Sequence, residues 1–144
     1  MANVIPDSFK TDLLKGTFNF DSSGGSTFKL ALYTDISGLT TSTTAFTTTN
    51  EVSTSGTSYS SGGNTLTNNG VAVSSNIAFV DFADLTFSSV TLSAVGALIY
   101  KSGGSNPAVL VLDFGGTKTA TNGDFVVQFP TASSSAAIIR LGNA

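Results

Sequence analysis

The stretch that decides the fold is residues 95–114, which read VGALIYKSGGSNPAVLVLDF. Two apolar runs, Val95–Lys101 and Ala108–Phe114, flank a loop of glycine, serine, asparagine and proline. Branched and aromatic side chains favour strands, and the loop residues favour a tight reversal of the chain. The stretch therefore predicts a β-hairpin.

Both strands of this hairpin are apolar on both faces. Ala97–Tyr100 and Val109–Leu112 show none of the polar alternation expected of a strand with one wet face. One interpretation is a pair of central strands covered on both sides by the same chain. The other is that one face, with Leu98 and Tyr100, meets a neighbouring subunit, because large exposed apolar patches are rare on monomers.

Shorter strand patterns surround the hairpin. The predicted breaks between them are at Asp84, Gly115-Gly116, Asn122-Gly123 and Pro130. About eight short antiparallel strands at this spacing predict one all-β domain over residues 1–144, either a β-sandwich or a jelly-roll-like barrel. The additional strands are expected at Thr27–Thr34, Val71–Ser74, Ile77–Phe82, Leu85–Leu92, Asp124–Phe129 and Ala136–Leu141.

One short helix is predicted over residues 6–16, started by Pro6 with Asp7 or Ser8 as N-cap, and ended before Gly16. A helix this short needs a surface to dock on, which belongs either to this chain or to a neighbour. The segment Ala2–Gly16 is therefore a candidate contact arm. Its candidate interface residues are Ile5, Phe9, Leu13 and Leu14.

Residues 35–70 differ from the rest of the chain, being rich in threonine, serine, glycine and asparagine. A loop of this length inside a compact domain is usually an interaction element or otherwise functional. Phe46, Tyr59 and Leu66 are spaced as anchors. We therefore expect an ordered excursion with short strands.

Composition excludes several classes of protein. Charged residues make up only 10% of the 144 residues, and the net charge is −3. Nucleic-acid binding and attraction to anionic membranes both need clustered lysine and arginine, so neither is expected. The mean hydropathy is +0.25, but no apolar run approaches the roughly 20 residues of a spanning helix, and the N-terminus does not resemble a secretory signal.

The sequence contains no histidine and no cysteine. The common catalytic triads, Cys–His pairs and most zinc or iron sites are therefore excluded. Carboxylates could still serve a glycosidase, but no calcium-loop or phosphate-loop pattern accompanies them. We expect no catalytic residue, no metal and no cofactor. The carboxylates considered are Glu51, Asp81, Asp84, Asp113 and Asp124.

Segments spread over nearly the whole chain carry a family resemblance. They are Ile5–Gly16, Phe28–Thr34, Asn50-Glu51-Val52, Val80–Asp84, Gly96–Tyr100, Val111–Gly115, Phe129-Pro130-Thr131 and Ile138-Ile139-Arg140. Their order and spacing resemble a family of small structural proteins encoded by tailed bacteriophages and prophages. The resemblance implies a virion component assembled in the bacterial cytoplasm, with no catalytic residues.

Three functions are consistent with these patterns. The first is a capsid decoration (cement) protein on the head exterior, whose partners are copies of itself, in a trimer or another ring, and the major capsid protein. The second is a tail, collar or head–tail connector component that contacts neighbouring tail proteins. The third is a carbohydrate-binding module for host-surface glycans, in which Tyr33, Tyr59 and Tyr100 would be exposed stacking residues.

Overall fold

A computed structural model describes residues 3–143, so Met1, Ala2 and Ala144 of the predicted domain lie outside the described residues. The described chain is all-β with one short helix, as predicted, and its strands form two antiparallel sheets. The elements are α1 (Asp7–Leu14), β1 (Phe28–Tyr33), β2 (Asn64–Thr65), β3 (Asn68–Ser74), β4 (Ile77–Phe82), β5 (Leu85–Lys101), β6 (Ala108–Val127) and β7 (Ile139–Leu141).

The predicted hairpin is present as β5 and β6, and it is much longer than predicted. Its strands pair from Tyr100 opposite Ala108 near the loop to Leu85 opposite Val127 at the open end. The predicted breaks at Gly115-Gly116 and Asn122-Gly123 were wrong, because both lie inside β6. The prediction of two strands within 85–101 was wrong because these residues form the single strand β5, and the prediction of a separate strand at Asp124–Phe129 was wrong because β6 continues to Val127.

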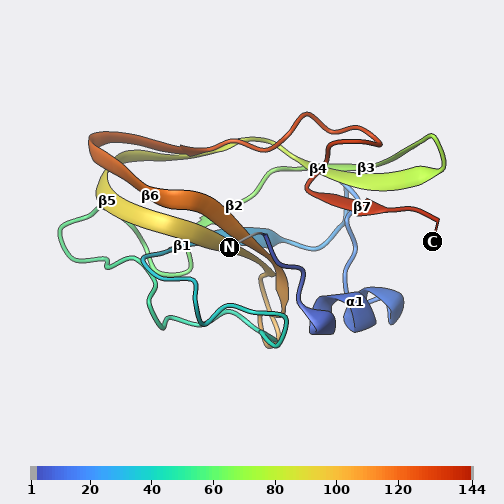
Figure 1. Cartoon of the computed structure of the whole chain (residues 1–144), viewed down its shortest axis with the longest axis horizontal. Coiled ribbons are helices and arrows are strands. Elements are labelled where there is room, and N and C mark those ends of the chain that lie inside the picture. Colours follow the sequence, from blue (N-terminus) through green and yellow to red (C-terminus); the bar gives the residue numbers. More distant parts are fainter. Residues whose placement is uncertain (1–2, 144) are drawn as a thin grey trace.

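Glycine and asparagine bend β6 instead of ending it. Gly115, Gly116 and Asn122 have positive φ angles of 75°, 151° and 46°, and the register with β5 shifts near them. Such bulges kink a strand and increase its twist while pairing continues. In Figure 1 the hairpin turns sharply at the left, so its outer half runs back above its inner half.

The first sheet has the strand order β2-β1-β5-β6, and the second has the order β3-β4-β7. β1 pairs with the inner half of β5, from Phe28 opposite Lys101 to Tyr33 opposite Gly96. The second sheet lies at the upper right in Figure 1, in line with the outer half of the hairpin, and α1 lies below it.

The main core lies between the two layers of strands. It joins residues of the inner strands, such as Leu30 and Ile99, to residues of the outer half, such as Phe87 and Phe125, and to Phe82 of β4. Phenylalanine rings extend it to the helix. The ring centroids of Phe9 and Phe18 lie 4.9 Å apart with the rings tilted, and those of Phe20 and Phe28 lie 4.6 Å apart with the rings stacked.

A second core covers the opposite face of the inner strands. Residues 34–62, here called the cover segment, place Ile36, Leu39 and Phe46 over Leu98 and Tyr100. Isolated bridges tie this segment to the sheet, from Glu51 to Tyr33 and from Ala45 to Pro107, and the next strand after β1 is β2. The two-sided apolar hairpin is therefore explained by central strands that the chain itself covers on both faces.

Candidate functional site

Three of the six predicted interface residues lie in the interior. Leu98 and Tyr100 are buried beneath the cover segment, and Phe9 is buried against the phenylalanines of the main core. For these three residues the predicted interface is wrong in the folded chain, because intramolecular contacts already take up their apolar surface. Ile5 and Leu13 are partly buried against the main core, and only Leu14 projects freely into solvent.

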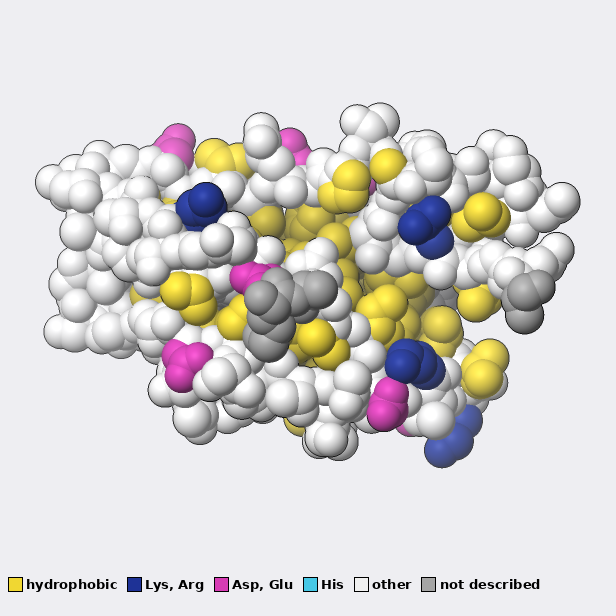
Figure 2. Space-filling view, in the orientation of Figure 1, with side chains coloured by type: hydrophobic (Ala, Val, Ile, Leu, Met, Phe, Trp, Pro, Cys, Tyr) yellow, Lys and Arg dark blue, Asp and Glu magenta, His cyan; other side chains and the backbone are white. Residues whose placement is uncertain are grey.

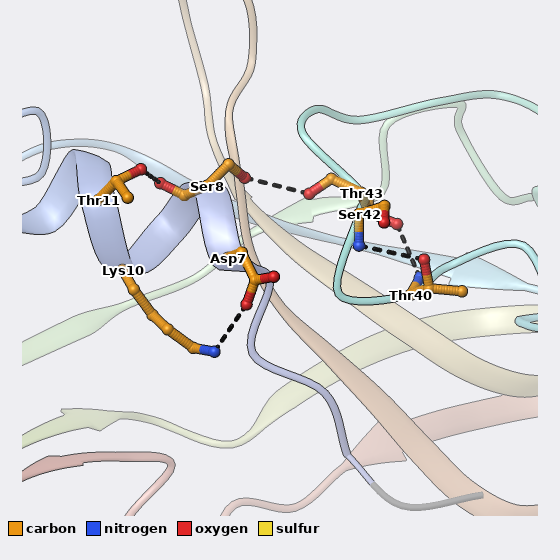
Figure 3. A network of polar contacts seen from close by, with 7 residues as sticks. All are labelled: Asp7, Ser8, Lys10, Thr11, Thr40, Ser42 and Thr43. Atoms are coloured by element: carbon orange, nitrogen blue, oxygen red, sulfur yellow. Dashed lines mark hydrogen bonds and ion pairs between the residues drawn. The ribbon is translucent and has the colours of Figure 1, made fainter.

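The N-terminal segment is part of the fold instead of a free arm. Val4 pairs with Val111 of β6 through two backbone hydrogen bonds of 2.9 and 2.8 Å. The N–H of Asp7 donates to the carbonyl of Thr41 in the cover segment, and the Ser8 hydroxyl donates to the carbonyl of Thr43 (Figure 3). Removing this segment would therefore uncover core residues.

Local contacts hold the helix and the facing loop in shape. Lys10 forms an ion pair of 2.9 Å with Asp7, and the hydroxyl of Thr11 donates to the carbonyl of Ser8. On the facing loop, the N–H of Thr40 donates to the hydroxyl of Thr43, as Figure 3 shows. The predicted side-chain N-cap was wrong, since Pro6 is the capping residue and makes no side-chain bond there.

All three tyrosines are buried, which removes the residues on which a sugar-binding site was predicted. Each hydroxyl is engaged. Tyr33 donates to the carbonyl of Thr47 and Tyr100 donates to the carbonyl of Gly62, while Tyr59 donates to a carboxylate oxygen of Glu51 at 2.8 Å. Stacking on a sugar needs an exposed ring face, and none of these rings offers one.

Glu51 is the centre of a polar cluster that fastens the cover segment. One carboxylate oxygen accepts the Tyr59 hydroxyl and the N–H of Gly62 at 2.6 Å, and the other accepts the Ser61 hydroxyl at 2.7 Å. The Tyr59 oxygen also accepts the N–H of Leu32 at 3.0 Å. Burial of the ring raises the pKa of Tyr59 above its usual value, although the hydrogen bond from the N–H of Leu32 acts in the opposite direction.

The other carboxylates considered from the sequence serve local structure. Asp84 accepts the N–H of Phe129 at 2.8 Å, and Asp113 accepts the N–H of Gly115 at 2.8 Å, which lowers the pKa of Asp113. Asp81 accepts from Asn69, and Asp124 accepts from the N–H of Ser89. These contacts stabilise turns and strand ends. Asp113 also lines a surface hollow of about 440 Å³ together with Asp35.

The hollow beside the outer half of β6 has a volume of about 360 Å³ and is lined by Phe114, Lys118, Asp124 and Phe125, among others. Across residues 3–143, no group of three or more Asp or Glu side chains is placed to hold a metal ion. In the same range, no helix has the length and apolar character needed to cross a membrane.

Exposed apolar side chains gather at one end of the molecule. Val71 and Val73 of β3 and Leu141 of β7 are 51%, 70% and 62% exposed. The register places them on one face of the second sheet, in line with the buried Val80 and Ile139. These three residues are here called the valine face. They lie on the side of the sheet that faces the main core, but at a part of the sheet that extends past the core, so solvent reaches them.

The end of the helix lies at the same end of the molecule. α1 runs below the second sheet in Figure 1, and its last residue, Leu14, is 86% exposed. Figure 2 shows hydrophobic side chains around a hollow at this right-hand end. The sequence analysis did not identify Val71 and Val73 as interface residues. The alternation of apolar and polar side chains predicts a strand here, but it does not show how far that strand extends past the core.

No family model, no curated protein and no solved structure matches this chain.

Proposed function

We propose that this chain is a non-enzymatic structural protein of a tailed-phage particle, and specifically a capsid decoration protein on the head exterior. The observation that carries the proposal is the gathering of exposed apolar side chains at one end of a molecule with few charges. Among residues 3–143, five large hydrophobic residues are at least half exposed. Three of them belong to the valine face, and Leu14 lies at the same end.

Such an end suits attachment to a protein surface. Burying exposed valine and leucine side chains is favourable by roughly 25 cal/mol per Å² of apolar area. A small surface of this kind gives a weak single contact, but many symmetric copies on a shell multiply it. A low charge also limits repulsion between closely packed copies. The resemblance to tailed-phage structural proteins points to the same class.

The deciding experiment is cryo-electron microscopy of the intact particle with this chain located in the density. Copies spread over the icosahedral shell, with the valine face or Leu14 toward the capsid, are the expected result. A particle that contains no copy of the chain would overturn the proposal.

A station in the tail, collar or connector is the second candidate. The uncharged free edge of β3, next to the valine face, favours it, because an edge that joins two copies supplies one of the contacts that a stack of subunits needs. In this case the density lies at a single vertex or along the tail. The same reconstruction therefore separates the two stations.

A further inference from the structure

Each of the two sheets has two edge strands, and three of these four strands carry features that block pairing with another chain. β2 and β7 are only two and three residues long, and β7 contains Arg140. β6 is interrupted by register shifts, carries charged side chains such as Lys118, and pairs with Val4. Short length, charge and bulges are common means by which native sheets protect their edges.

β3 lacks this protection over most of its length. The strand has seven residues, with no charged side chain and no proline. Its register shift lies at the start, between Asn68 and Gly70, and Gly70–Ser74 then pairs regularly with β4. Val71 and Val73 project from this regular part with at least half of their surface exposed. A regular, neutral and apolar edge of this kind is a template for another strand.

The turn between β3 and β4 decides which backbone groups face outward. Ser75 and Asn76, both with positive φ, form a two-residue turn between Ser74 and Ile77. In such a hairpin the residues that flank the turn form a hydrogen-bonded pair, and hydrogen-bonded pairs alternate along the ladder. The N–H and C=O groups of Val71 and Val73 therefore point away from β4, toward the free edge.

We propose that β3 pairs antiparallel with β3 of a second copy of this chain, with Ala72 opposite Ala72 on a twofold axis. This register places Val71 of each copy opposite Val73 of the other. Since these are the residues whose backbone groups face outward, each pair exchanges both of its N–H···O bonds. The second sheets of the two copies become one continuous sheet.

A second copy fits this edge because the strand is complementary to itself. Neither copy brings a charged side chain to the contact, so like charges do not oppose one another across the strands. The paired valines lie on one face and extend the valine face of each copy into that of the other. A twofold contact uses the same patch on both subunits, and this edge meets that condition.

The contact is a weak one in solution. A pair of short strands buries less than the roughly 1,200 Å² typical of stable complexes, so its strength in a particle depends on repetition. The inference deepens the proposed function, in which copies of the chain contact one another, and it identifies the surface that they use.

The test uses the full chain at concentrations from micromolar to millimolar, with sedimentation velocity and amide exchange measured by NMR. A monomer–dimer equilibrium is expected, with exchange at the Val71 and Val73 amides slowing as the dimer forms. Val73→Pro removes an N–H that β4 does not use, so the hairpin is retained while the dimer dissociation constant rises about tenfold or more.

Val126→Lys is the matched control, because Val126 is 50% exposed and lies on the protected edge strand β6. This variant should dimerise as the wild type does, whereas Val71→Lys should not. A wild-type chain that stays monomeric at millimolar concentration, with unchanged Val71 and Val73 exchange, would overturn the inference. Dimerisation of a chain that is absent from particles would leave the inference standing and remove only the proposed function.

Discussion

At the scale of single residues, the hydroxyl of Tyr59 joins the cover segment to the inner sheet. It donates to Glu51 and accepts the N–H of Leu32, whose side chain is fully buried. A buried N–H that loses its acceptor keeps its desolvation cost without compensation. The cover segment therefore depends on this one hydroxyl more than its many exposed serines and threonines suggest.

Tyr59→Phe should lower the free energy of unfolding by about 1–3 kcal/mol, since it leaves the N–H of Leu32 and one Glu51 oxygen with fewer partners. Urea unfolding at neutral pH measures this change. Ser61→Ala is the control, because Ser61 bonds to the same carboxylate from an exposed position. Its effect should stay within about 0.5 kcal/mol. Equal effects of the two variants would contradict the role given to Tyr59.

The tyrosines also predict how stability depends on pH. Burial raises the pKa values of Tyr33, Tyr59 and Tyr100 in the folded chain, while in the unfolded chain they titrate near 10. Above that pH the folded state holds more protons than the unfolded state. The stability from these groups is thus fully present below pH 10 and falls as pH rises beyond it. Urea unfolding between pH 8 and 11 should show this fall, and a flat profile would contradict it.

At the scale of elements, only one face of α1 packs against the rest of the molecule. Phe9 is 2% exposed within the cluster of phenylalanine rings, whereas Leu14 at the end of the same helix is almost free. The helix thus closes the lower end of the main core, and its last residue remains available for contact with another protein.

Phe9→Ala should lower the free energy of unfolding by about 3–5 kcal/mol through the cavity that it leaves. Leu14→Ala is the control on the same helix and should change it by less than about 0.5 kcal/mol. Thermal unfolding followed by circular dichroism measures both variants. If Phe9→Ala were as stable as Leu14→Ala, the N-terminal segment would have to be the free arm that the sequence suggested.

Next to the bend in the β5–β6 hairpin, other atoms approach the backbone of Gly96 closely. A Cβ atom at this position would lie 2.4 Å from the carbonyl oxygen of Leu112 and 2.8 Å from a methyl group of Ile36. Gly96→Ala should therefore destabilise the fold by about 1–3 kcal/mol, because the backbone has to shift. Gly38→Ala is the control, since no atom lies within 4 Å of its added Cβ. Urea unfolding that ranks the two variants equally would contradict this account.

At the scale of the whole molecule, the two cores share the inner strands. The main core packs on one face of these strands, with Leu30 and Ile99, and the second core packs on the other, with Ala31 and Leu98. Neither core can be lost without exposing apolar surface of the strands that hold the other. We therefore expect the chain to unfold in a single cooperative transition.

Paired substitutions test this cooperativity. Ile36→Ala in the second core and Phe82→Ala in the main core should lower the midpoint of the same transition, followed by both tyrosine fluorescence and circular dichroism. Two separate transitions in the Ile36→Ala variant would show instead that the cover segment unfolds independently. The exposed substitution Val126→Ala serves as the control, with an expected change within about 0.5 kcal/mol.

Strand positions were predictable wherever the side chains alternate or form an apolar run, as at Ile77–Phe82 and in the inner hairpin. The bend in the β5–β6 hairpin was not predictable, because Gly115-Gly116 and Asn122-Gly123 are compatible both with a turn that ends a strand and with a bulge inside it. Whether Leu98 is a core or an interface residue depends on where the cover segment lies. The cover segment is rich in threonine and serine, and its apolar residues follow no regular spacing from which its position could be predicted. Val71 and Val73 were not predictable as a surface, because their exposure follows from how far β3 extends past the core.

The bent hairpin also bears on the order in which the chain folds. Pairing of β5 with β6 can begin next to the loop of residues 102–107 and extend away from it one residue pair at a time. Each step then closes only a small additional loop. Once pairing passes the bend at Gly115 and Gly116, the second layer is already attached to the first in the correct orientation. β1 pairs with β5 over sequence separations from 63 residues (Tyr33 opposite Gly96) to 73 residues (Phe28 opposite Lys101), and this long-range docking then has a formed template. The kinetic nucleus is therefore expected at the glycine-rich loop and the strands next to it, far from both chain ends.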